Sequence, residues 1–145
     1  GPDLMAVNFD YVELLWAIRE AAMRGVVRGT EGVRNEAVLL IMNPPKTGRI
    51  YRRRGVEHQA SAPGEAPASD HGASGLAGRI RTSYNIAGLA GTVIASTDYA
   101  AALEYGTQRI EPRPYMRPAL ANRREAIEAD IQREVARAIR KFRTV

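Results

Sequence analysis

Apolar residues in the first third of the chain recur at spacings of three and four residues. The members of this pattern are Leu14, Leu15, Ile18, Ala22, Val26, Val33, Ala37, Leu40 and Ile41. Such spacing gathers the apolar side chains on one face of a helix. Asp10 and Glu13 stand where a helix N-cap and its capping-box partner are expected. We therefore predict one long helix that begins after Asp10 and ends before Pro44-Pro45.

Three glycines interrupt this pattern. Gly25, Gly29 and Gly32 each disfavour the helix by about 1 kcal/mol relative to alanine. We expect the glycine-containing middle to be the weakest part of the helix and the place where it would kink.

Residues 43–75 are of a different kind, because proline, glycine, serine and alanine dominate and large apolar residues are nearly absent. Such a composition buries too little surface to offset the entropy lost on ordering. A stretch of this length without secondary structure is typical of a functional or disordered segment. We predict an extended arm or loop that becomes ordered only against a partner.

Polar and apolar residues alternate after this stretch. Ile80, Thr82, Tyr84 and Ile86 point to one side and their neighbours to the other, as in a half-buried strand. A turn at AGLAG and β-branched residues over 92–97 predict a second strand, and hence a β-hairpin.

Two more helices are expected towards the end of the chain. Asp98 is placed to cap a short helix over 99–105, and Gly106 to end it. Pro112 and Pro114 require an extended segment, and Pro118 suits the first turn of a last helix. The apolar stripe of that helix contains Leu120, Ile127, Ile131, Val135, Ala138 and Phe142.

These elements indicate an α+β fold with a long N-terminal helix, a protruding arm, a small antiparallel sheet, a short helix and a long C-terminal helix. The 145 residues suit a single domain, 1–145, with the arm at 43–75. Residues 1–2, Gly-Pro, match the remnant of a cleaved purification tag.

The chain is basic, with a net charge of +5 and a pI near 10.0. All but two of its basic residues are arginines. This bias suits phosphate or carboxylate recognition, and it is equally expected from a GC-rich coding genome. The charge alone leaves a small basic DNA-binding module as an alternative function. Against base readout, the only basic helix is long and carries charges of both signs.

The sequence offers little for catalysis. It contains no cysteine, so thiolate metal sites and disulfides are excluded. His58 and His71 are the only histidines, and both lie in the predicted arm, without rigid support for a metal. No nucleophile elbow, phosphate-binding loop or zinc-protease motif is present. We expect no catalytic residues, no cofactor and no metal.

Two separate motifs stand out in the chain. The first is PPKTGRIYRRRGVEHQASAPGEAPASDHGASGLAGRI, and the second is YAAALEYGTQRIEPRPYMRPAL. Both resemble the phage tail-component family typified by gene product ten of coliphage HK-97. The first is similar to that family's run H-x-A-S-A-P-G-E-x-P-A followed by a strand start, and the second to Y-A-x-x-x-E-x-G-T … P-x-P-F-x-R-P-A. The matching positions of the second motif are Tyr99, Ala100, Glu104, Gly106, Thr107, Pro114, Tyr115, Arg117, Pro118 and Ala119. The resemblance covers about residues 44–120.

The chain departs from the family pattern in two places. DHGASGL stands where Asp-Thr-Gly-x-Leu is usual, which leaves the register of the following strand open, and Tyr115 replaces a phenylalanine. The resemblance implies a non-enzymatic virion protein, a tail-completion subunit that forms a homo-oligomeric ring at the head–tail junction. Its implied partners are other neck or tail proteins, such as head-completion and tail-terminator subunits, with non-specific contact to packaged DNA and none to membrane. Such a subunit is assembled in the cytoplasm of the bacterial host.

Two groups of residues are candidates for assembly or partner contacts. The first, Tyr51 with Arg52, Arg53 and Arg54, is either a solvated basic loop or a contact with acidic neighbours or DNA. The second contains Glu104, Arg113 and Arg117. Glu104 is either solvated or paired with an arginine such as Arg117. The RPYMRP segment is either a rigid connector that buries Tyr115 and Met116 or a partner site.

Overall fold

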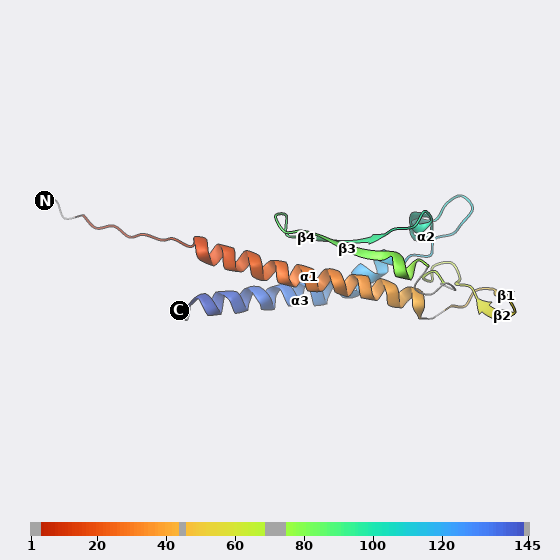
Figure 1. Ribbon diagram of the computed structural model, residues 1–145. Coiled ribbons are helices and arrows are strands. Elements are labelled where there is room, and N and C mark those ends of the chain that lie inside the picture. The colour runs from red at the N-terminus through yellow and green to blue at the C-terminus, as the bar shows by residue number, and fades with distance from the viewer. Residues whose placement is uncertain (1–3, 44–45, 69–74, 144–145) are drawn as a thin grey trace.

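The computed structural model describes residues 4–43, 46–68 and 75–143. The elements in order are α1 (Val12–Met42), β1 (Ile50–Arg53), β2 (Val56–Gln59), the 3-10 turn η2 (Ala77–Arg79), β3 (Ile80–Asn85), β4 (Ala90–Ala95), α2 (Ala100–Tyr105) and α3 (Met116–Arg143). They form a long, thin molecule in which two hairpins and the short helix accompany a pair of long helices (Figure 1). The predicted α+β class is confirmed. Across the described ranges, no helix has the length and apolar content needed to cross a membrane.

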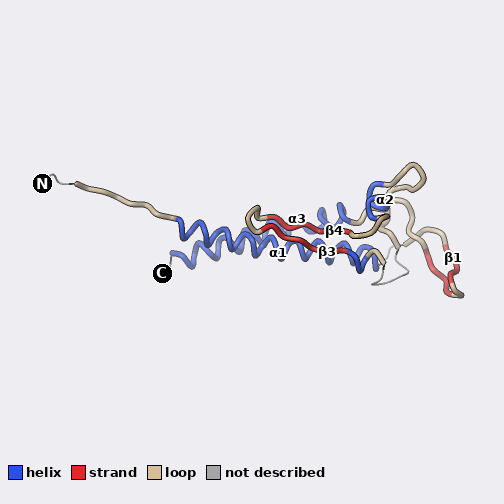
Figure 2. Tube along the Cα trace, turned by 45° about the horizontal axis from the view of Figure 1, so that its top comes forward, coloured by secondary structure: helices blue, strands red, loops and turns tan. Residues whose placement is uncertain are grey.

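Helices α1 and α3 run antiparallel along most of their lengths (Figures 1 and 2), and the glycines of α1 lie at their contact. A Cβ atom on Gly25 would lie 2.7 Å from Ile131 Cγ1 and 2.9 Å from Ile131 Cα. One on Gly29 would lie 2.9 Å from Ile127 Cγ1. The missing side chains let the two backbones approach, and α1 continues through the glycines as a single helix of 31 residues. Helix–helix packing thus offsets the poor helix propensity of glycine.

The start of α1 differs by one residue from the prediction. Tyr11 occupies the N-cap position, and its side chain makes no capping hydrogen bond. Asp10 still serves the helix end, because its Oδ1 accepts a hydrogen bond from the backbone N–H of Val12 at 3.1 Å.

The β3–β4 hairpin packs on the middle of α1 and confirms the predicted alternation from Ile80 to Tyr84. Ile86, which the alternation assigns to the same strand, instead lies in the turn after β3, and β4 begins at Ala90, two residues before the predicted start. Its register pairs Ile80 with Ala95 and Asn85 with Ala90. On the face towards α1, Thr82 Oγ1 and Tyr84 Oη donate hydrogen bonds to Glu31 Oε1 at 3.0 and 2.6 Å. The hydrogen bond from Tyr84 is the largest of several contacts that lower the pKa of the Glu31 carboxyl.

The prediction of an arm without secondary structure is wrong for residues 50–59. β1 and β2 pair antiparallel around a turn in which Arg54 has φ 53° and Gly55 has φ 76°. Gly48 N–H donates to the Ala60 carbonyl at 2.8 Å, and Ala60 N–H donates to the Arg49 carbonyl at 2.9 Å, which closes the base of the hairpin. Backbone hydrogen bonds and a two-residue turn order this segment without a core, and composition alone does not reveal them.

The rest of the predicted arm partly folds back onto the domain. Lys46 Nζ donates to the carbonyl oxygens of Leu40 and Ala66, each at 3.0 Å. Ser61 and Pro67 are buried. Residues 44–45 and 69–74, which include His71, lie outside the described residues.

The core gathers where α1, η2, β3, α2 and the start of α3 meet. Its buried residues are Val33, Ala37, Ile41, Leu76, Ala77, Ile80, Ala100, Tyr115 and Ala119. Two predictions about the helices at this end need correction. The N-cap of α2 is Tyr99, without a side-chain capping bond, so Asp98 does not cap it. α3 begins at Met116, so Pro118 lies in its first turn, as predicted. Its predicted apolar stripe is only partly covered, since Leu120 and Phe142 stay exposed.

Candidate functional site: the joint between α2 and α3

The carboxylate of Glu104 lies at the centre of the joint between α2 and α3. It sits near the end of α2, and only 4 % of the residue is exposed. It accepts hydrogen bonds from the backbone N–H groups of Tyr115, Met116 and Arg117 at 3.0, 2.8 and 3.1 Å. These groups open α3 and have no partner within that helix. Glu104 therefore caps α3 from a distance in sequence and meets the positive end of its dipole.

Arg117 holds the same carboxylate from the outer side. Its Nε donates to Glu104 Oε2 at 2.9 Å, and its Nη2 donates to the Glu104 carbonyl at 3.0 Å. The guanidinium also lies over the Tyr105 ring, 4.9 Å from the ring centroid. The structure therefore selects the predicted Glu104–Arg117 pair over a solvated carboxylate.

The protonation states at this joint follow from its contacts. Burial raises the pKa of the Glu104 carboxyl, but hydrogen bonds from the Tyr115 and Met116 backbones and from Arg117 outweigh it and lower the pKa overall. Burial raises the pKa of Tyr115 to about 12, and its hydroxyl donates to the Ala100 carbonyl at 3.0 Å. Glu104 is thus charged and Tyr115 neutral at physiological pH, and both are engaged in structural bonds.

Gly106 and Thr107 reverse the chain between the two helices. Gly106 has φ 76°, and its N–H donates to the Ala102 carbonyl at 2.8 Å, as expected for a helix-ending glycine. A Cβ there would lie 2.8 Å from Pro112 Cδ. Thr107 Oγ1 accepts from the N–H groups of Arg109 and Ile110, each at 3.1 Å. The Glu-x-Gly-Thr part of the second motif therefore builds the turn and the helix cap.

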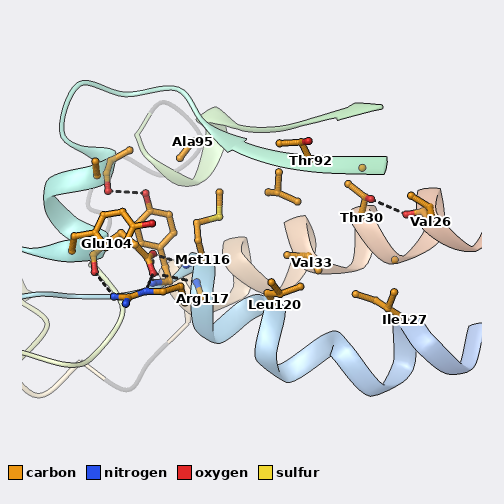
Figure 3. A pocket seen from close by; sticks show the side chains of 17 residues that line it. Val26, Thr30, Val33, Thr92, Ala95, Glu104, Met116, Arg117, Leu120 and Ile127 are labelled. Carbon is orange, nitrogen blue, oxygen red and sulfur yellow. Dashed lines mark hydrogen bonds and ion pairs between the residues drawn. The ribbon is translucent and has the colours of Figure 1, made fainter. Parts of the chain in front are cut away.

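A largely apolar hollow of about 600 Å³ adjoins this joint. Figure 3 shows its side chains converging from α1, β4, α2 and α3. Val26, Val33, Val93, Met116, Leu120 and Ile127 supply most of the apolar lining, and Glu104 and Arg117 lie at one end. Because that carboxylate already accepts from three backbone N–H groups and one guanidinium, the hollow chiefly offers apolar contact surface.

Arg113 links the joint to the segment that follows β2. Its Nε donates to the Ser61 carbonyl at 3.4 Å and its Nη1 to the Glu111 carbonyl at 3.3 Å. The Gly64 N–H donates to the Pro112 carbonyl at 3.0 Å. Tyr115 is 1 % exposed, so the RPYMRP segment is a connector that buries this ring, as one of the two interpretations predicted.

The other candidate residues lie on the β1–β2 hairpin, beyond α2 at the same end of the molecule (Figures 1 and 2). The Tyr51 ring stacks on His58, with centroids 5.5 Å apart and an interplanar angle of 25°. Arg52, Arg53 and Arg54 are exposed. The predicted site therefore divides into the buried Glu104 carboxylate with its exposed partner Arg117, a link at Arg113, and an exposed basic hairpin.

Sequence reasoning missed a second buried carboxylate, at the far half of the helix pair. Glu134 is 3 % exposed and lies 3.3, 3.4 and 3.6 Å from nitrogens of Arg24, Arg28 and Arg137. The Arg24 hydrogen bond, followed by the charges of Arg137, Arg24 and Arg28, holds its pKa below the ordinary value. The mixed charges of α3 give no sign of this burial, and only the placement of α1 reveals the cluster. Among the residues that the structure describes, no group of three or more potential ligands is placed to hold a metal ion.

No family model, curated protein or solved structure matches this chain.

Proposed function

We propose that this chain is a structural virion protein of a tailed bacteriophage, a tail-completion subunit that forms a ring where the head joins the tail. The proposal starts from the two motifs that resemble the phage tail-component family. It assigns the protein no reaction, because the ionisable groups of the joint are engaged in structural bonds.

The observation that carries the proposal is that the two motifs, distant in sequence, meet in space. The turn ASAPGE of the first motif contacts the PRP segment of the second through Gly64 to Pro112 and Arg113 to Ser61. Glu104 then ties this segment to α2. The matching residues therefore belong to one connected unit, as expected if both motifs are parts of one family fold.

The shape of the chain supports an assembly role. The pair of long helices leaves several large apolar side chains exposed, among them Leu15, Trp16 and Leu120. Extended apolar surface of this kind is typical of proteins that bury it against partners.

A second candidate is a small basic DNA-binding module, which the exposed Arg52, Arg53 and Arg54 favour. A hairpin tip of this charge suits phosphate contacts. In a neck subunit the same arginines would face DNA passing through the ring or acidic residues of a neighbouring protein.

Purified virions test the proposal. We expect the chain to be a stoichiometric component of intact particles and gold-labelled antibody to mark the head–tail junction by electron microscopy. A tail-tube protein from the same particles is the labelling control. Absence of the chain from purified particles, together with high-affinity binding to one DNA sequence at physiological salt, would replace the proposal by the DNA-binding alternative.

A further inference from the structure

The segment before α1 is apolar and exposed. We call residues 4–11 the N-terminal segment. It runs away from the helices in an extended conformation (Figure 1). Met5 is 94 % exposed, Val7 69 % and Phe9 73 %. An apolar segment with so little cover in its own chain favours a contact with another surface.

The N-terminal segment has a strand-like pattern of side chains. Val7, Phe9 and Tyr11 fall on one side of the extended chain, while Asn8 and Asp10 fall on the other. The rings of Phe9 and Tyr11 stack with centroids 6.5 Å apart, which places them on the same side. The segment therefore presents a continuous apolar edge.

A surface suited to this edge lies along the first half of α1. Two adjoining hollows share Trp16, Arg19, Ile86 and Leu89 and lie between α1 and the turn that joins β3 to β4. We call them together the apolar groove. Trp16 is 62 % and Ile86 71 % exposed. Arg19 donates a hydrogen bond to the Ala87 carbonyl, which fixes the turn against α1 and preforms the groove.

We propose that the N-terminal segment of one copy of this chain docks in the apolar groove of a second copy. The two surfaces match in length. Eight extended residues span roughly 26 Å, and the groove follows α1 from Val12 to Val27, roughly 23 Å of helix. Their charges are also compatible, because Asp10 is the only charged side chain of the segment at neutral pH, and the groove is lined by two arginines, Arg19 and Arg24, against one carboxylate, Glu20.

The direction of the segment favours a second copy over its own groove. The Val12 N–H donates to Asp10 Oδ1, and the Leu15 N–H donates to the Tyr11 carbonyl at 2.9 Å. These bonds set the path on which the chain joins α1. Folding back onto its own groove would require a sharp reversal at this point, where the Asp10 carboxylate is already bonded to the Val12 N–H that opens α1.

The contact joins two different surfaces, so each copy has one segment to offer and one groove to fill. Repeated contacts of this kind close into a ring when the rotation between copies allows it. The ring itself rests on the proposed function. An aromatic side chain buries roughly 150–250 Å², so two aromatics and three smaller apolar residues bury on the order of 500–800 Å². That area is at or below the ~800 Å² per partner of a stable complex. We therefore expect dimers of two copies to be weak, and closed rings to be more stable because each copy then makes two such contacts.

Cross-linking between copies tests the contact, and the natural absence of cysteine makes the products simple. Val7→Cys and Ile86→Cys lie near the middle of the segment and of the groove. A mixture of the two single variants, one with a size tag, is treated with a short bismaleimide. We expect the mixed dimer to exceed the dimers that each variant forms alone. No mixed dimer, or an internal cross-link in the monomeric double variant, would overturn the proposal.

Sedimentation of the full chain gives a second readout. Phe9→Glu places a charge on the segment without touching a helix, and we expect it to weaken self-association by about thirtyfold, as for a central interface anchor. Leu39→Glu, on an exposed part of α1 outside the groove, is the matched control and should associate like the unmodified chain. Equal weakening by both, or by neither, contradicts the contact. A chain found at the virion neck but without cross-links would refute only this contact, whereas cross-links in a chain absent from virions would refute the proposed function.

Discussion

Replacing Glu104 by alanine should destabilise the domain strongly, because this carboxylate caps α3 from within the fold. The substitution removes the acceptor of three backbone N–H groups and of the Arg117 guanidinium. A hydrogen bond to a charged group contributes about 1.5–3 kcal/mol. The Tyr115 N–H, in a residue only 1 % exposed, would lose its partner outright. Met116 and Arg117 lie nearer the surface, where water can partly replace the carboxylate.

We therefore expect Glu104→Ala to lower the free energy of unfolding by about 2–4 kcal/mol, out of the ~5–15 kcal/mol typical of a domain. At about 4 °C per kcal/mol for a chain of this size, the melting temperature should fall by roughly 8–16 °C. Circular dichroism at 222 nm would follow the melt. Glu111→Ala, at an exposed position of the same connection, is the control and should change the stability by less than about 0.5 kcal/mol. A melting temperature for Glu104→Ala within about 2 °C of that control would refute the capping role.

The dependence of stability on pH tests the same carboxylate. The folded pKa of Glu104 lies below its ordinary value of 4.5. The stability that the ionised Glu104 carboxylate adds to the folded state is therefore fully present above pH 4.5 and is lost as the pH falls through the folded pKa. We expect the unmodified chain to melt at lower temperature as the pH drops from about 5 to 3. In Glu104→Gln the melting temperature should fall less over this pH range, because the contribution of Glu104 is missing at every pH. Some fall should remain, because the pKa values of Glu31, Glu65 and Glu134 are also lowered. An identical pH profile would contradict the assignment.

Three further predictions follow from the helix contact, the basic hairpin and the net charge. Gly25→Ala should cost about 1–3 kcal/mol in urea unfolding, because the new methyl group meets the Ile131 backbone. Gly32→Ala, whose methyl group meets only the movable end of the Arg123 side chain, should be neutral or stabilise the fold by up to about 1 kcal/mol. Equal changes in stability for the two variants would contradict the close approach of the helices at Gly25. Replacing 50–59 by a short Gly/Ser link should leave the melt nearly unchanged but reduce infectious particles, and full rescue would make the hairpin dispensable. Double-stranded DNA should bind weakly at low salt and dissociate between roughly 50 and 200 mM salt, whereas tight sequence-selective binding would favour the regulatory alternative.

Local patterns predicted much of the fold. The alternation at Ile80, Thr82 and Tyr84 placed the β3–β4 hairpin and the face that meets α1. The pairing of Glu104 with Arg117 was one of two interpretations, because sequence spacing alone does not bring α2 to the start of α3. These successes concern residues whose neighbours are close in sequence or share a recognisable motif.

Two of the errors concern contacts between distant segments, and a third concerns a local hairpin. Gly25 and Gly29 were expected to weaken α1, and their part in admitting α3 depends on residues about a hundred positions away. Glu134 carries no local sign of burial, because its arginine partners come mainly from the other long helix. The hairpin at 50–59 rests on backbone hydrogen bonds and a two-residue turn, to which composition is insensitive.

Joining of heads to tails in vitro is the most direct test of the proposed role. A lysate from a phage or prophage that lacks this gene would supply DNA-filled heads and finished tails, to which the purified chain is added. We predict that unjoined heads and tails accumulate without the chain, and that its addition yields joined, infectious particles in proportion to the amount supplied. Joined particles in the lysate without the chain, or heads and tails that stay separate after its addition, would contradict the proposal.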